Sequence, residues 1–148
     1  MRQARLMHRW VREAVLAGND VIVLGDFNTE ETGTTTRRQS DLGIACGLET
    51  PEPGDDLVDL NLKLPEDKRQ THLLPGRQYD RILCSRSLLE DDPDRPDLVF
   101  SKIEILRQLC VRGELDDPQQ HWDDYWGQPA AERDLSDHFP VMATFEIR

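Results

Sequence analysis

Cysteines are few in this 148-residue chain, and none has the paired spacing of a metal or redox motif. Cys46, Cys84 and Cys110 lie far apart in the sequence, so a disulfide framework and a zinc site are both disfavoured. Each cysteine stands in or beside an apolar stretch, which favours buried free thiols. Free thiols favour a reducing compartment, and we expect a cytoplasmic protein.

Long apolar runs and an excess of basic residues are also missing. No stretch is long and apolar enough for a transmembrane helix, and no apolar segment of a signal peptide follows Met1. The chain carries 29 acidic and 18 basic residues, a formal net charge of −11. Such a surface repels nucleic-acid phosphates and disfavours broad binding to DNA. A phosphate substrate is still compatible with it, because bound divalent cations reverse the local charge.

The apolar residues that are present gather in blocks, which predicts one α/β domain over residues 1–148. Helical spacing covers residues 2–17 and ends at Gly18-Asn19. A short helix is expected over residues 40–48, with Ser40 as its N-cap. The segment 57–64 is expected to be a strand or extended. Clearer strand patterns, the first of them expected to be buried on both faces, cover residues 21–24, 79–84, 98–109 (with a bulge) and 141–147.

Polar side chains stand at the edges of three predicted strands. Asp26 and Asn28 follow the first strand, Asp80 opens the second, and Asp137-His138 precede the last. Each group alone has an ordinary explanation: Gly-Asp-Phe-Asn and Ser-Asp are common in turns, Asp80 has arginine neighbours, and a lone histidine is often structural. The other histidines, His8, His72 and His121, are expected to be structural or exposed.

Taken in order, the three motifs resemble those of the endonuclease/exonuclease/phosphatase superfamily. This is the fold of pancreatic DNase, apurinic endonucleases, bacterial sphingomyelinases, inositol-polyphosphate 5-phosphatases and deadenylases. The family's Gly-Asp-hydrophobic-Asn motif is similar to Gly25–Asn28, and its aromatic-Asp-x-Ile-Leu strand to Tyr79–Leu83. Its Ser-Asp-His-x-Pro-Val motif is similar to Ser136–Val141.

The resemblance implies a role for each matching residue. Asp26 would orient or deprotonate the attacking water and has a possible share in the metal site, and Asn28 would bind that water or a phosphate oxygen. Asp137 would contribute to a site for Mg²⁺ or Mn²⁺. His138 would stabilise charge on a phosphate oxygen, and Asp80 would hydrogen-bond the other ring nitrogen of His138 and favour the imidazolium. Phosphoryl transfer needs these three elements on general grounds: a positioned water, a metal and a cation near the developing charge.

The resemblance also implies that this chain is about half of a DNase-like domain. The family fold is a four-layer α/β/β/α sandwich, and its first half supplies an early Asn, a metal-binding Glu and a His or Tyr. No strand-borne Glu precedes Gly25. We therefore expect a mostly antiparallel mixed sheet with flanking helices and one uncovered apolar face, which would bind the missing N-terminal half or a second copy. The chain alone is expected to be weakly active or inactive.

Two functions are compatible with these residues. The first is a metal-dependent phosphodiesterase, phosphatase or nuclease-type hydrolase, for which a small molecule, nucleotide or lipid head group is favoured over duplex DNA. The alternative is a non-catalytic interaction module that kept the fold without the metal-binding Glu. Residues 111–135 form the longest irregular stretch. In the family the loop at this place borders the active-site mouth, so Trp122 and Trp126 are candidates for substrate contact. Simple burial of both rings is the competing interpretation.

Overall fold

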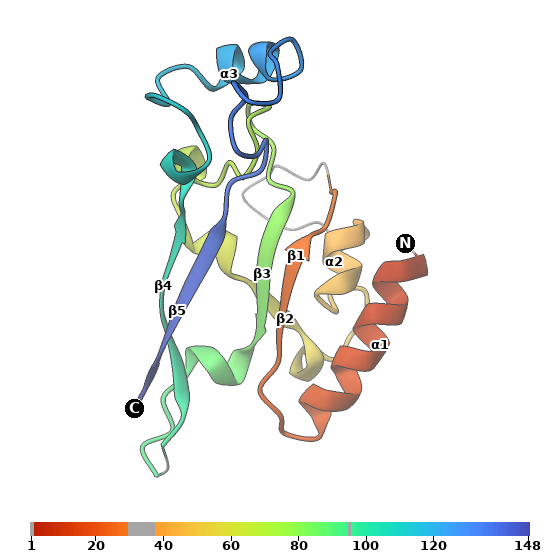
Figure 1. The fold of residues 1–148 in the computed structure, drawn as a ribbon. Coiled ribbons are helices and arrows are strands. Elements are labelled where there is room, and N and C mark those ends of the chain that lie inside the picture. The colour runs from red at the N-terminus through yellow and green to blue at the C-terminus, as the bar shows by residue number, and fades with distance from the viewer. Residues whose placement is uncertain (1, 30–37, 95) are drawn as a thin grey trace.

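The computed structural model describes residues 2–29, 38–94 and 96–148 (Figure 1). They form a mixed α/β fold with two antiparallel sheets and few helices, as the sequence predicted at this coarse level. The helices are α1 (Arg2–Leu16), α2 (Asp41–Ala45) and α3 (Pro118–Tyr125), and the strands are β1 (Ile22–Asp26), β2 (Leu57–Asp59), β3 (Asp80–Ser85), β4 (Leu98–Ile105) and β5 (Val141–Ile147). Short 3₁₀ helices occupy Pro53–Asp55, Leu60–Lys63, Glu66–Lys68, Arg86–Leu89 and Arg107–Leu109.

The first sheet has the strand order β1-β3-β2, with both pairs antiparallel. The central strand is therefore β3, and its residues Arg81–Ser85 are all buried. The prediction that the first strand is buried on both faces is wrong. β1 lies at the edge of the sheet, with Ile22 42% and Leu24 69% exposed. A run of apolar residues cannot distinguish these cases, because it contains no information about the neighbouring strands.

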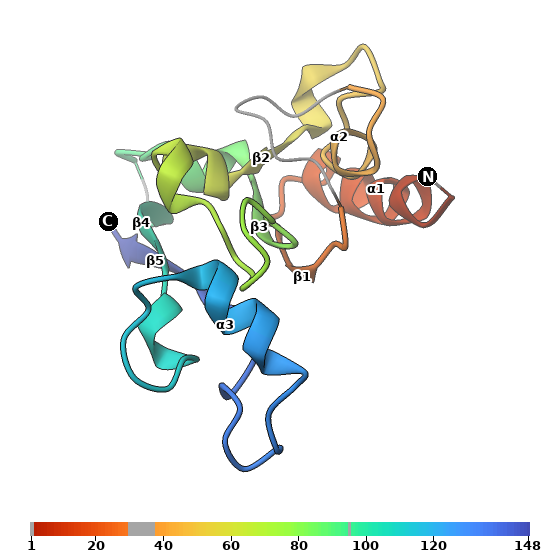
Figure 2. The same cartoon turned by 90° about the horizontal axis from the view of Figure 1, so that it is seen from above.

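The α1 and α2 helices cover one face of this sheet (Figure 2). Val11 of α1 and Leu42 of α2 pack with Leu57 and Leu83 of the sheet. Gly18 ends α1 with φ of 80°, a conformation that glycine adopts without steric cost. The predicted cap of α2 is confirmed, since the Ser40 hydroxyl accepts a hydrogen bond of 2.9 Å from the Gly43 amide.

The second sheet, the antiparallel pair β4–β5, lies on the other side of the first sheet (Figure 2). Ile82 and Cys84 of β3 pack with Leu60, Leu88 and Ile103, and partly buried Val141, Ala143 and Phe145 of β5 adjoin this cluster. The second sheet thus covers β3 on this face of the first sheet. It leaves Ile22 and Leu24 of β1 exposed. The predicted bulge is present, but it falls between Phe100 and Lys102, whereas the sequence pattern placed it near Leu106.

Three smaller predictions were tested. The three cysteines are buried free thiols, as expected. The extended segment 57–64 is a strand only as far as Asp59 and then turns into the 3₁₀ helix Leu60–Lys63. Residues 111–135 contain α3, which the sequence reading treated as irregular. Its start has a helix signal, because Pro118 occupies the first turn and the Asp117 carboxylate accepts hydrogen bonds from the Gln119 and Gln120 amides.

No helix among the described residues is long and apolar enough to cross a membrane. The four-layer sandwich that the resemblance implied has more layers than the described residues show, and it stays a prediction.

Candidate functional site

Two of the predicted carboxylates meet at the end of the β1–β3 ladder. The ladder pairs Ile22 with Cys84 and ends with Asp26 opposite Asp80. Because side chains of directly paired residues stand on the same face of a sheet, both carboxylates lie at one edge. Like charges placed directly opposite each other are destabilising, so a nearby cation or positive side chain would stabilise this pair.

Asn28 folds back onto Asp26. Its backbone amide donates to Asp26 Oδ1 at 2.8 Å, and its side-chain amide donates to Asp26 Oδ2 at 2.9 Å. Asn28 has φ of 46°, a left-handed conformation that asparagine tolerates better than most residues. Each Asp26 oxygen keeps acceptor capacity, since a carboxylate offers about four lone-pair positions. The turn therefore holds an exposed carboxylate in a defined orientation.

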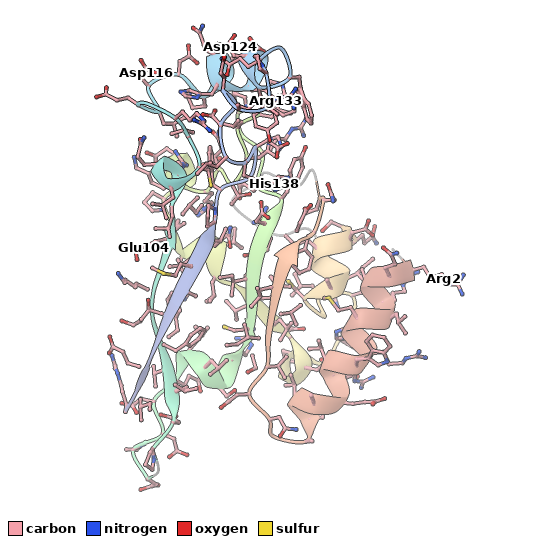
Figure 3. The ribbon with its side chains drawn as sticks, in the orientation of Figure 1. Arg2, Glu104, Asp116, Asp124, Arg133 and His138 are labelled. Atoms are coloured by element: carbon pink, nitrogen blue, oxygen red, sulfur yellow. The ribbon has the colours of Figure 1, made fainter. Side chains whose placement is uncertain are left out.

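Asp80 also holds His138, as the sequence predicted. Its Oδ2 lies 2.8 Å from His138 Nδ1, which is ordinary hydrogen-bonding distance. The acceptor is a carboxylate, so the ring nitrogen is the donor in this pair. Figure 3 shows His138 near the ends of β3 and β5, beneath the segment that carries α3. Both residues line a cleft of about 310 Å³ whose apolar lining includes Leu24 and Val141.

Buried polar groups hold Asp80 in place. The Asp80 amide donates to Thr71 Oγ1 at 3.0 Å, and the Asn61 side chain donates to the Asp80 carbonyl at 3.0 Å. Behind them, buried Arg81 pairs with Asp59 at 2.8 Å, and burial raises the pKa of that Asp59 carboxyl while Arg81 opposes the rise. Asp80, a catalytic candidate, is therefore held rigidly by its buried neighbours.

The segment Thr71–Leu73 joins Asp80 to the last motif. The Leu73 amide donates to the Asp137 carbonyl at 2.8 Å, and the Phe139 amide donates to the Thr71 carbonyl at 2.8 Å. These bonds make His72 and His138 partners in an isolated antiparallel bridge. The Ser136 hydroxyl accepts from the His138 amide at 3.0 Å and closes the turn.

Sequence reasoning missed His72, which is only 5% exposed and lies inside the site. Its Nε2 is 3.6 Å from Asp137 Oδ2, and its ring lies 4.7 Å, centroid to centroid, from that of His138. Burial lowers the pKa of His72, as does the charge of His138, and Asp137 opposes the shift. The sequence did carry a signal for its burial, because His72 stands between a threonine and two leucines, as is typical of an imidazole in the core.

The two tryptophan candidates have different surroundings. Trp122 is partly buried, packs with the cluster of Leu73 and Phe139, and lies 5.1 Å from the His72 ring. Trp126 is 62% exposed and lies under the Arg133 guanidinium, 5.6 Å from it. The His72 ring thus lies between Trp122 and His138. Trp126, in contrast, contacts rings and side chains of its own loop.

The other two histidines are structural, in line with expectation. His8 is buried on α1, 3.4 Å from Asp55. His121 Nδ1 lies 2.8 Å from Asp134 Oδ2, and His121 Nε2 lies 3.0 Å from the Glu114 carbonyl oxygen. Both partners are acceptors, which requires protons on both ring nitrogens. Burial lowers the pKa of His121, but the bonds to Asp134 and Glu114 outweigh it and leave the pKa raised.

The polar groups at the cleft are chemically suited to a divalent cation. Potential ligand atoms of Asp26, Asp80 and His138 lie within 4.8 Å of one another, and so do those of His72, Asp137 and His138. Mg²⁺ is commonly bound through one or two carboxylates, with water and substrate oxygens completing its shell. Asp26 and Asp137 are carboxylates of this kind, one in each of the two groups, which share His138.

Comparison with known proteins yields no relative. No protein-family model, curated protein or solved structure matches this chain. The chemistry of the cleft residues is therefore the basis for assigning a function.

Proposed function

We propose that this protein is a metal-dependent phosphoester or phosphodiester hydrolase, and that the chain is the C-terminal part of a four-layer domain of the endonuclease/exonuclease/phosphatase type. The observation that carries the proposal is the Asp80–His138 hydrogen bond of 2.8 Å, with Asp26 directly opposite Asp80. A charged triad of this kind at a strand end is difficult to explain as a stabilising feature. It is well suited to a phosphate ester and the cation that accompanies it.

Each residue has a defined part in the proposed reaction. Asp26, held by Asn28, accepts a proton from the attacking water. His138 donates through Nε2 to a non-bridging phosphate oxygen, where negative charge develops in the transition state. Asp80 holds the His138 ring through Nδ1 and so aims Nε2 at the phosphate. The buried contacts of Asp80 keep this geometry fixed before substrate arrives.

Asp137 and Asp26, which stand in two separate groups that share His138, would supply carboxylate ligands to Mg²⁺ or Mn²⁺, and a bound ion of this kind would neutralise phosphate charge. Two carboxylates are few for a metal that takes six ligands. We therefore expect the isolated chain to bind the cation weakly and to turn over slowly.

The cleft favours a small phosphoester over duplex DNA. Among the described residues, Arg81 is the only arginine or lysine that lines it, and the Arg81 guanidinium is paired with Asp59. Tight binding to DNA requires several lysine or arginine contacts to phosphates. Nucleotides, lipid head groups and other small phosphoesters fit this site better, since one cation and one histidine suffice for one phosphate.

The proposal is tested by hydrolysis of bis-p-nitrophenyl phosphate at high protein concentration, with Mg²⁺ or Mn²⁺. Asp26→Asn should reduce the rate by at least about a hundredfold. Asp20→Asn is the matched control, because it removes the same charge just beyond the opposite end of β1. Equal rates for wild type and Asp26→Asn, or a rate independent of the metal, would contradict the proposal.

One observation favours the second candidate function, a non-catalytic interaction module. Ile22 and Leu24 of β1 are exposed, and Leu24 lines the cleft together with Val141 of β5. Exposed apolar patches commonly mark interaction sites. This function predicts self-association or partner binding without metal-dependent hydrolysis. Sedimentation together with the hydrolysis assay separates the two functions.

A further inference from the structure

We propose that His72 is a positioning residue for the site: its Nε2–H is directed at Asp137 and fixes the orientation of that carboxylate. The inference rests on the proposed function, in which Asp137 binds the cation. It concerns a histidine outside the three motifs that suggested the site.

The proton on His72 can be assigned from its backbone contact. The Leu74 amide donates to His72 Nδ1 at 2.9 Å. An imidazole nitrogen that accepts a hydrogen bond carries no proton, so the proton of neutral His72 is on Nε2. Nε2 is the atom that faces Asp137 Oδ2 at 3.6 Å. His72 Nε2–H is therefore a donor that faces an acceptor, Asp137 Oδ2.

This separation is longer than an ordinary hydrogen bond. Hydrogen bonds in active sites commonly shorten when ligand binds. The buried His72 ring has little freedom to turn away, because it contacts the rings of Tyr79, Trp122 and His138 at centroid distances of 5.2, 5.1 and 4.7 Å. The Asp137 side chain is the more exposed partner, at 26% against 6% for His72, so in this proposal it is the group that shifts to close the contact.

The same contact argues against His72 as a metal ligand. Ligation by Nε2 requires that nitrogen to be unprotonated, which would move the proton to Nδ1. A protonated Nδ1 could not accept the Leu74 amide, and a partly buried amide would lose its partner. His72 is therefore placed to act on Asp137 rather than on the cation directly.

His72 and Asp80 then each orient one of two adjacent residues, Asp137 and His138 respectively. Asp80 accepts from His138 and holds its ring, whereas His72 faces Asp137 with a donor and orients its carboxylate. The isolated bridge between His72 and His138 keeps the two pairs in register. Groups of this kind outside the metal ligands commonly change metal affinity about 10–100-fold when they are removed.

Three variants separate the two nitrogens of His72. His72→Gln places an amide donor near the position of Nε2, His72→Asn places an acceptor near that of Nδ1, and His72→Phe keeps only the ring. The dissociation constant for Mn²⁺, measured by water-proton relaxation, should rise about tenfold for Asn and Phe and less than about threefold for Gln. His8→Gln is the control, since it changes another buried histidine, on α1 at the far side of the sheet.

Rescue by Asn instead of Gln would overturn the proposal and leave His72 a backbone anchor for Leu74. Unchanged Mn²⁺ binding in all three variants would overturn it as well. Melting temperatures identify any variant that fails to fold, and the Gln–Asn comparison is then made between those that do.

A spectroscopic test needs no metal. The ¹⁵N spectrum of the full chain should show His72 as the Nε2–H tautomer, and Asp137→Asn should shift its Nε2–H signal. An Nδ1–H tautomer, or a signal indifferent to Asp137→Asn, would refute the positioning role. If wild type neither binds Mn²⁺ nor hydrolyses a phosphoester, the proposed function fails, and this spectrum still decides whether His72 holds Asp137.

Discussion

Asp26 and Asp80 are the last cross-strand pair of the β1–β3 ladder, two carboxylates directly opposite each other. A sheet gains nothing from this pairing, since like charges at paired positions repel. His138 contacts one member of the pair and Asn28 the other. The two opposed carboxylates therefore cost the fold stability, and under the proposed function a bound cation would offset that cost.

We expect Asp26→Asn to stabilise the fold when no divalent cation is present. Removing one of two opposed charges should raise the free energy of unfolding by about 0.2–1 kcal/mol. Urea denaturation in EDTA measures this gain. In wild type, Mg²⁺ should increase stability, because a ligand that binds only the native state stabilises it, and the variant should lose most of that response. Destabilisation of the variant in EDTA would contradict the interpretation.

Asp80→Asn should lower kcat less than His138→Ala does. The asparagine leaves the imidazole in place and weakens only its orientation and charge, whereas alanine removes the donor to phosphate altogether. Hydrolysis rates at saturating substrate, with urea denaturation as the folding control, make the comparison. The reverse order would mean that Asp80 acts on substrate or metal itself.

Trp122 and Trp126 should respond differently to replacement by alanine. Trp122 packs on Leu73 and His72, so its loss should cost about 2 kcal/mol of stability. Trp126 is 62% exposed, and its loss should change the melting temperature little. If Trp126 contacts substrate, Trp126→Ala should raise KM and leave kcat unchanged. An unchanged KM would assign this ring to the loop alone.

The loop around α3 should loosen as pH rises. The pKa of His121 is raised in the folded chain, so its contribution to stability is complete below the unfolded pKa of about 6.5 and is lost as pH rises through the folded pKa. Limited proteolysis of residues 111–135 should therefore quicken from about pH 6.5 upward. His121→Gln should remove this pH dependence. A loop whose cleavage rate is the same at pH 5.5 and pH 8.5 would contradict the role of the His121–Asp134 pair.

The exposed apolar face should make the chain self-associate. Leu24→Gln and Ile22→Gln should shift the sedimentation profile toward monomer without loss of stability, because both side chains are largely exposed. Trp10→Gln on α1, 64% exposed on another surface, is the control and should leave association unchanged. A monomeric wild type at high concentration would show that this face needs no partner.

The sequence predicted those elements whose signals are local. The α1 stop at Gly18, the cap of α2 at Ser40 and the strand β5 are each determined by a few neighbouring residues, and the structure has all three. The burial of β5 does not alternate as its sequence predicted, because Ala143, Thr144 and Phe145 are all half-buried and Ile147 is exposed. The order of the three motifs also predicted that Asp80 would hold His138, a contact between residues 58 positions apart.

The missed features depend on neighbours that are distant in sequence. Whether Leu24 is buried depends on what covers β1, and β1 proved to be an edge strand. His72 belongs to the site because an isolated bridge places it beside His138, and no local pattern encodes that pairing. α3 had a local signal in Asp117-Pro118, which the acidic and aromatic composition of the loop obscured.

Chemical rescue of His138→Ala tests the central claim most directly. The claim is that His138, held by Asp80, supplies positive charge and a proton donor to a phosphate oxygen in a metal-dependent hydrolysis. The rate of bis-p-nitrophenyl phosphate hydrolysis in Mg²⁺ should fall about a hundredfold or more in His138→Ala. Added imidazole should restore part of it, because the empty space lies in the 310 Å³ cleft. A variant that hydrolyses the ester as fast as wild type, with no response to imidazole, would contradict the account.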